Sequence, residues 1–386
     1  MNERYSHLDG LRGLAALVVV FCHFVQLYLP AAFFRAAPDH FGESLISASP
    51  LNLIFNGNFA VAIFFVLSGF VLAAPFFNKN SSTWYLKAAI KRYPRLAIPA
   101  LASTLIPCLI YISFGSNFAA TTELSGYTKK EYFSGFDSIT TAVWQGLIGT
   151  FLFAEQDYNR VLWTIRTELI GSFGVFALLP ILGRYRARII AYAALVVILK
   201  DSYLLGFVLG TLAADLVIGY RVSLSRTTSI IALTAGLYLG AFPYVGQELL
   251  IWRPISSIPL KNLFVISHIT GAFLCIIALS GLPSLQRALT TKTCAFLGRI
   301  SYSMYLIHFT LIGFLGSFII ISLSPLGYGT SLIVAMTLLL PITVGASYLF
   351  TRFIDEPSIQ FSNYLSKTLI RFCTKSRETE SAPLGS

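Results

Sequence analysis

Three ionisable side chains interrupt the first apolar run of the chain, and their spacing places them on one face of a helix. Asp9, Arg12 and His23 are surrounded by Leu, Ala, Val and Phe. At about 3.6 residues per turn, Arg12 and His23 lie roughly 20° apart around the helix axis, and Asp9 lies within about 40° of that line. Such groups are costly in lipid, so this face must contact protein or water. The imidazole could act as a proton acceptor; the alternative is a histidine that only packs against a neighbouring helix.

A carboxylate elsewhere in the chain could orient this imidazole. Glu168 lies about five residues inside a predicted helix, and His23 lies about seven residues, or roughly 10 Å, below the outer end of its own helix. The two side chains would then meet at one level. We predict that Glu168 or Asp9 holds His23 as a general base, as a carboxylate does in hydrolase triads.

A basic cluster follows the second apolar run. Lys91, Arg92 and Arg95 lie there without an acidic residue among them, and Arg12 would flank the same end of the cavity. These cations could bind phosphate oxygens through charge-assisted hydrogen bonds. The alternative is that they only orient the protein and contact lipid head groups.

Further side chains are candidates for the substrate side of the cavity: Ser68, Trp163, Arg166, Tyr305 and His308. Tyr305 and His308 share roughly one helical face, although packing inside the bundle would also explain His308. Ser68 with Gly69 is more typical of close helix approach than of a nucleophile, because no base has evident access to it.

The composition shows what kind of element positions these residues. Of 386 residues, 55% are hydrophobic and 12% are charged, about half the charged share of a soluble domain. We therefore predict an all-α, polytopic integral membrane bundle rather than several soluble domains. About ten transmembrane helices are expected, near 10–30, 55–77, 96–115, 162–183, 187–201, 203–220, 228–246, 263–282, 300–323 and 329–351.

The charges predict the orientation and the domain boundary. The net charge of +11 comes from short basic loops between the apolar runs, and we expect these loops to lie on one side of the bundle. Such a distribution indicates membrane topology rather than nucleic-acid binding, and it predicts that both termini are cytoplasmic. The segment 139–154 is apolar but short, so we expect an interfacial or re-entrant helix there. Residues 1–365 are expected to form the membrane domain, and the polar tail 366–386 to be disordered beyond about Lys375. The cysteines show no metal-site spacing, and no metal is expected.

The motifs resemble those of one family. Leu8-Asp-Gly-Leu-Arg-Gly-Leu-Ala-Ala16 followed by His23 is similar to the opening signature of the membrane-bound acyltransferase 3 family. Further similar motifs follow in the same order: Phe64 to Phe70, Arg92-x-x-Arg95, Leu162-Trp163 leading to Glu168, Gly298 to His308, and Glu356-Pro357. The resemblance covers roughly Tyr5 to Leu365. Arg166 departs from the family's pattern, since an apolar or small polar residue would be more comfortable two positions before Glu168. This cation could pair with Glu168 and weaken the predicted dyad.

The resemblance implies a ten-helix membrane enzyme that transfers an acyl group, commonly acetyl, from acyl-CoA to hydroxyls of glycans or lipid-linked acceptors. In that pattern His23 is the catalytic position, Arg12, Arg92 and Arg95 contact the donor, and Glu168 is an acidic position on the fourth helix. His23 could serve as general base or carry the acyl group itself. A transporter whose proton relay uses His23, Glu168 and His308 is the alternative function, and a structural scaffold is a third.

Overall fold

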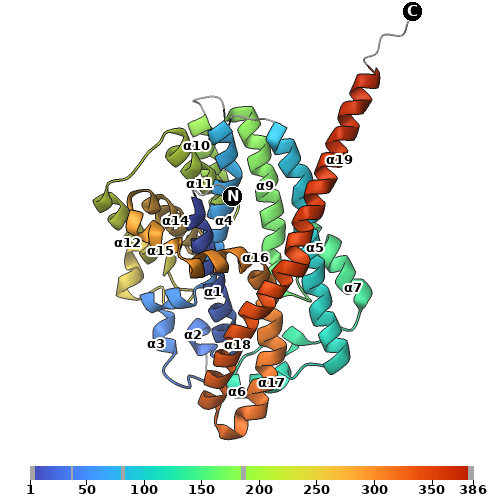
Figure 1. Ribbon diagram of the computed structural model, residues 1–386. Helices are drawn as coiled ribbons and strands as arrows, with labels where there is room; N and C mark the ends of the chain where they lie inside the picture. The colour runs from blue at the N-terminus through green and yellow to red at the C-terminus, as the bar shows by residue number, and fades with distance from the viewer. Residues whose placement is uncertain (1–4, 36–37, 80–82, 184–187, 381–386) are drawn as a thin grey trace, which may run out of the picture.

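The computed structural model describes residues 5–35, 38–79, 83–183 and 188–380, and these residues form helices without any strand (Figure 1). Seven helical stretches of this part are long and apolar enough to cross a membrane: Ser6–Tyr28, Gly57–Asn78, Trp84–Phe114, Arg160–Leu182, Leu263–Gly281, Lys292–Leu326 and Tyr328–Arg371. The all-helical, multi-pass fold predicted from the sequence is confirmed. The predicted count of about ten is not, because by length and composition only these seven qualify.

A helix nevertheless lies at each of the predicted positions. The long helices are α1 (Ser6–Tyr28), α4 (Gly57–Lys79), α5 (Thr83–Phe114), α9 (Trp163–Leu182), α14 (Leu263–Ala278), α16 (Lys292–Leu311) with α17 (Ser317–Leu323), and α18 (Tyr328–Phe350). Three are shorter: α10 (Arg188–Leu199), α11 (Leu205–Ala214) and α12 (Arg226–Gly240). The short helices explain why hydropathy predicted more spans than length supports.

Small helices cover the end of the bundle drawn at the bottom of Figure 1. They are α2 (Ala31–Phe34), α3 (Ser44–Ser47) and α6 (Phe118–Ser125). Helix α7 (Ile139–Trp144), which continues through Leu152 as one short apolar helix, lies instead beside α5 on the right of Figure 1. At the other end, α19 (Glu356–Glu380) projects beyond the bundle as a long helix (Figure 1). Residues 366–380, expected as a polar tail, are therefore helical, and 381–386 lie outside the described residues.

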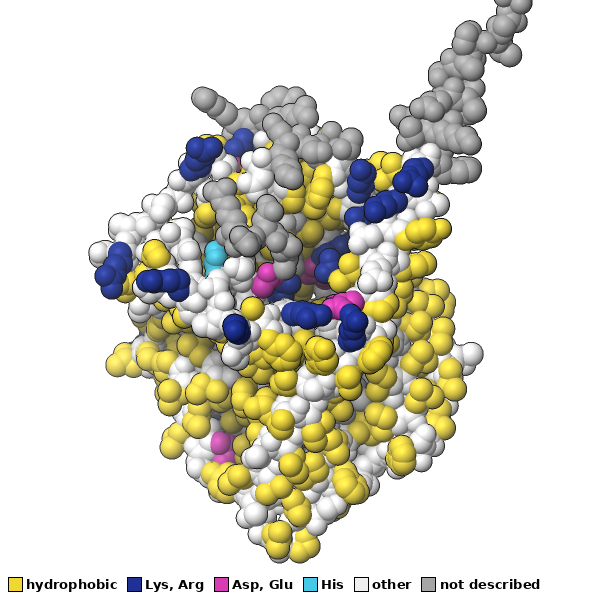
Figure 2. Space-filling view, viewed as in Figure 1, with side chains coloured by type: hydrophobic (Ala, Val, Ile, Leu, Met, Phe, Trp, Pro, Cys, Tyr) yellow, Lys and Arg dark blue, Asp and Glu magenta, His cyan; other side chains and the backbone are white. Residues whose placement is uncertain are grey.

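The surface fits a membrane environment. Figure 2 shows hydrophobic side chains covering the lower part of the visible face, while Lys and Arg gather in the upper half. Large apolar side chains such as Ile190, Val197, Ile333 and Phe353 are exposed on the helices. A continuous apolar surface of this kind is stable when lipid covers it.

Helices α1 and α16 run parallel in close contact, and this contact positions the candidate site. A Cβ atom built on Gly13 would lie 2.5 Å from the Gly298 nitrogen, and one on Gly298 would lie 2.4 Å from the Asp9 carbonyl oxygen. The absence of side chains at both glycines lets the backbones approach. Gly13 and Gly298 are 298 − 13 = 285 positions apart, the same offset that separates His23 from His308. The glycine contact and the histidine contact thus share one helix register.

We expect Gly13→Ala to destabilise the protein by about 1–3 kcal/mol, because the new methyl group meets backbone atoms that cannot move aside. Thermal unfolding of the detergent-purified protein measures the effect. Gly174→Ala on α9 is the matched control, since its Cβ would meet nothing within 4 Å. Equal unfolding temperatures for the two variants would contradict the close approach of α1 and α16.

A buried ion pair joins the shorter helices. Asp215, in the π-helical turn that follows α11, is fully buried and accepts two bonds from Arg188, at 2.6 Å from Nε and 2.9 Å from Nη2. Arg188 also donates to the Gly183 carbonyl at 3.2 Å. These bonds satisfy a carboxylate that could not remain alone in an apolar environment, so we assign this pair a structural role.

Candidate functional site

Two histidines from α1 and α16 form the centre of the site. The Nδ1 atom of His23 lies 2.9 Å from Nε2 of His308, and Nδ1 of His308 lies 2.8 Å from the Met304 carbonyl oxygen. A carbonyl oxygen only accepts, so His308 carries its proton on Nδ1 and presents Nε2 as an acceptor. His23 must then donate from Nδ1, which also lies 3.2 Å from the Val19 carbonyl. The remaining nitrogen of His23, Nε2, is then unprotonated, and no described residue donates a hydrogen bond to its lone pair.

The residues around His23 hold its imidazole ring in place while leaving it partly exposed. His308 is fully buried, whereas His23 is only partly buried. Phe309 packs edge-on against His23, with ring centroids 5.1 Å apart. An imidazole fixed by a donated Nδ1 proton, with Nε2 unprotonated, has the form that a general base requires.

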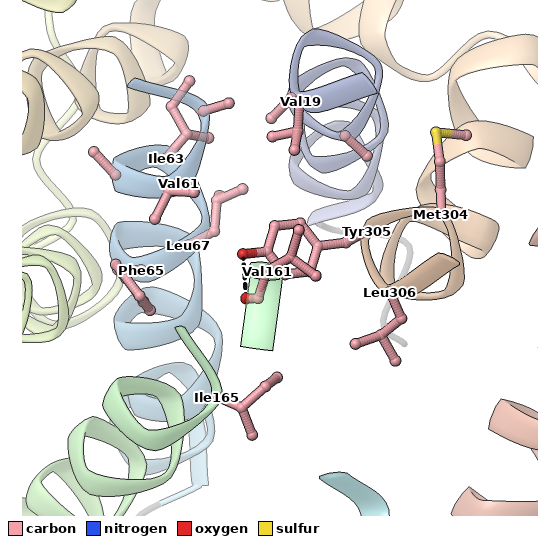
Figure 3. Packing of buried hydrophobic residues seen from close by; sticks show 14 of the residues in the cluster. Val19, Val61, Ile63, Phe65, Leu67, Val161, Ile165, Met304, Tyr305 and Leu306 are labelled. Carbon is pink, nitrogen blue, oxygen red and sulfur yellow. Dashed lines mark hydrogen bonds between the residues drawn. The ribbon is translucent and has the colours of Figure 1, made fainter. Parts of the chain in front are cut away.

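Tyr305 lies one turn before His308 and links α16 to the start of α9. Its hydroxyl donates to the Val161 carbonyl at 2.9 Å, as the dashed line in Figure 3 shows, and lies 2.9 Å from the Thr164 hydroxyl. Trp163 packs on Tyr203 rather than on a histidine, with centroids 5.3 Å apart. Tyr305 therefore anchors the wall of the site, and its hydroxyl is already engaged.

A second polar group lies toward the other end of the bundle, between α4, α5 and α9. Glu168 accepts hydrogen bonds from Arg92 and, at 2.9 Å, from the Ser68 hydroxyl. Arg92 also donates from Nε to the Ser172 hydroxyl at 2.7 Å. The Arg92 and Glu168 side chains are only 12% and 18% exposed, so each compensates the burial of the other.

These contacts differ from the predicted arrangement of the carboxylates. Asp9 pairs with Arg12 at 2.8 Å, about 20 Å along α1 from His23 at 1.5 Å per residue. Among the described residues, His23 contacts His308 and neither Glu168 nor Asp9. The expected dyad of His23 with a carboxylate is replaced by a histidine pair, because α9 presents Glu168 to Arg92 instead. Arg166 is exposed and does not pair with Glu168.

The remaining cations lie at the same end as Arg12. Arg95 is exposed, and Lys91 is partly exposed; neither forms an ion pair with a described side chain. Arg95 is close enough to both Arg12 and Arg92 for electrostatic repulsion. In Figure 2, basic and acidic side chains surround a hollow in the upper half of the visible face. Arg95, which is exposed, and Lys91, which is partly exposed, are therefore the cations most open to an anion, whereas Arg92 already donates to Glu168 and Ser172.

Several of these contacts could not be read from the sequence. The polar stripe of α1 and the shared face of Tyr305 and His308 were visible, but no pattern shows which helix lies beside α1. Asp215 carried a usable signal, since it is an acidic residue within an apolar run. Among the described residues, no group of three or more potential metal ligands is present.

Comparison with known proteins relates the chain to acyltransferases. A family model described as an acyltransferase domain matches residues 5–352. The chain is 22% identical to "Acyltransferase clz18" of Cochliobolus lunatus, over 80% of this chain and 82% of that protein. It is 24% identical to "O-acetyltransferase PaAT-1" of Phomopsis amygdali, over 82% and 74% respectively. A shorter match, 33% over 104 residues, covers 27% of this chain and 24% of "Acyltransferase MdmB" of Streptomyces mycarofaciens. No solved structure matches.

Proposed function

Because the chain belongs to the acyltransferase 3 family, we propose that it transfers an acetyl group from acetyl-CoA to a hydroxyl of a glycan or lipid-linked acceptor. The observation that carries this proposal is the free lone pair on Nε2 of His23, on the same helix as Arg12. A transporter would need a continuous path for its substrate; the family membership and the fixed imidazole favour group transfer.

In the proposed reaction, the acceptor hydroxyl gives its proton to Nε2 of His23, and its oxygen attacks the thioester carbonyl carbon. The carbon–sulfur bond breaks, and the imidazolium returns the proton to the departing CoA sulfur. His308 is a positioning residue, since its Nε2 holds the Nδ1 proton of His23 and stabilises the imidazolium. Transfer of the acetyl group through Nε2 itself would use the same lone pair.

The donor would bind with its phosphates at Arg92, Arg95, Lys91 and Arg12. From Arg12 to His23 is eleven residues of helix, or about 16 Å. The pantetheine arm of coenzyme A separates its phosphates from its thioester, so an extended arm would connect the two ends of the site. The binding energy of the phosphates would then position a thioester far from them.

The orientation follows the charge distribution. We propose that the Arg95 end and both termini face the cytoplasm, where acyl-CoA is available, and that the short helices α10, α11 and α12 also cross the membrane. The relevant membrane would be the cell membrane, with the 1–365 portion of the chain forming the catalytic domain.

Release of free thiol from acetyl-CoA by purified protein, in the presence of candidate glycans or lipid-linked alcohols, tests the proposed activity. We expect thiol release to depend on the acceptor and to match the amount of acetylated product. Acceptor-independent movement of a solute across vesicles, without thiol release, would instead support a transporter.

Removal of the Arg95 charge should mainly weaken donor binding. We expect Arg95→Gln to raise the Kd for CoA about tenfold, because one charge-assisted hydrogen bond to phosphate is worth roughly 1.5–3 kcal/mol and this site is exposed. Isothermal titration of the purified protein measures the Kd. Arg226→Gln, at another exposed arginine, is the control. Equal affinities in both variants would assign Arg95 to lipid contact and topology.

A further inference from the structure

Two polar atoms near Arg92 and Arg95 are buried and have no hydrogen-bond partner among the residues that the structure describes. They are the Tyr302 hydroxyl on α16 and Oδ1 of Asp355. Asp355 is 6% exposed and therefore more than nine-tenths buried. Buried polar atoms are nearly always hydrogen-bonded, and an unpartnered carboxylate oxygen is among the most costly exceptions. Two such atoms that interact with each other mark a place where a ligand could supply the missing partners.

The backbone holds Asp355 in this position. It ends the π-helical turn η11 (Thr351–Asp355), which connects α18 to α19. The Thr351 hydroxyl donates to the Ser303 hydroxyl at 2.7 Å, which ties the first residue of this turn to the residue after Tyr302. The next residue, Glu356, instead accepts bonds from Arg299 and Arg352 at 2.6 and 3.1 Å. Single π-helical turns are frequent at functional sites, and this one separates two adjacent acids into different environments.

The two unpartnered groups adjoin the proposed donor site. Asp355 interacts electrostatically with Arg95 and with Tyr302, and Tyr302 interacts with Arg92, Arg95 and Glu168. No described cation approaches Asp355 within ion-pair distance, although Arg95 lies near it. The arrangement combines the exposed Arg95, which can bind phosphate, with one buried acceptor and one buried hydroxyl that no described side chain satisfies.

We propose that Asp355 and Tyr302 form a subsite for a neighbouring N–H donor and acceptor of coenzyme A, an inference that rests on the proposed function. A carboxylate accepts from N–H groups and repels phosphate, whereas a phenol can donate to a ring nitrogen or carbonyl. Two parts of coenzyme A carry this pattern: the amino edge of its adenine ring and the secondary amides of its pantetheine arm. Recognition by this subsite selects the donor; it takes no part in the chemical step.

Binding measurements distinguish the adenine ring from the pantetheine amides as the group that the subsite binds. We compare the Kd of CoA with that of 4′-phosphopantetheine, which lacks the adenine nucleotide, in the full-length purified protein and in Asp355→Asn and Tyr302→Phe. Loss of a hydrogen bond to a charged group should raise the Kd roughly 10- to 100-fold for Asp355→Asn, with a smaller increase for Tyr302→Phe. If adenine is the ligand, only CoA binding weakens; if an amide is the ligand, both molecules lose affinity.

The control is Asp201→Asn, the same chemical change at an exposed aspartate between α10 and α11. Thermal unfolding shows whether each variant is folded, and Tyr302→Phe tests the subsite without changing a charge. Undiminished CoA binding in both Asp355→Asn and Tyr302→Phe would overturn the subsite alone. Absence of CoA binding by the wild-type protein would overturn the proposed donor and the subsite together.

Discussion

His23→Ala is expected to lower the rate of acetyl transfer by about 10²- to 10⁴-fold, the usual contribution of a positioned general base. The substitution removes the unprotonated nitrogen Nε2, while alanine favours the helical backbone of α1. Thiol release at saturating acetyl-CoA measures the rate. A fall in kcat with an unchanged Kd for CoA would locate the loss in the chemical step.

His308 offers a graded control for the same prediction. His308→Gln can still present an oxygen to the Nδ1 proton of His23, so we expect it to keep more activity than His308→Leu, which cannot. Full turnover by His23→Ala in folded, purified protein would exclude this histidine as the base. Equal activity of His308→Gln and His308→Leu would exclude His308 as its positioning partner.

The second large effect is expected on stability, at the ion pair between α5 and α9. Glu168→Leu should cost about 3–5 kcal/mol, because it leaves the Arg92 guanidinium buried beside an apolar side chain. Glu168→Gln keeps an oxygen for Arg92 and for Ser68 and should cost less. Thermal or denaturant unfolding of the detergent-solubilised protein provides the comparison.

A double variant distinguishes this explanation from simple loss of packing. When Arg92→Leu is added to Glu168→Leu, the unpaired charge disappears, and we expect part of the lost stability to return. Independent contributions would instead make the double variant as unstable as the sum of the two single variants, and that result would contradict a mutual compensation of charge.

The positions of the helices followed from the sequence because apolar runs of sufficient length have few alternatives in a membrane. The face of α1 that carries Arg12 and His23 was also predictable, since helical periodicity depends only on spacing. The family resemblance alone points to His23, Arg92 and Arg95; the chain belongs to that family, and the roles of these three residues stay predictions.

The pairing of side chains was not predictable in the same way. Hydropathy does not show which helices are neighbours, so His23 was predicted to meet Glu168, whereas the structure places His308 beside it. Arg92 competes for Glu168 because both lie on helices that pack together near the basic end. Asp355 was overlooked because its isolation depends on a local π-helical turn, which apolar periodicity does not indicate.

Gly13 and His23 are separated by the same number of residues on α1 as Gly298 and His308 on α16, so the site depends on the length of the segment between each glycine and its histidine. Each residue advances a helix by about 100°, so deleting one residue between Gly13 and His23 would turn the imidazole toward a different neighbour while the glycines stayed in place. Exchanging apolar side chains along that stretch would leave the ring direction intact. Evolution in this segment should therefore accept changes of residue type far more readily than insertions or deletions.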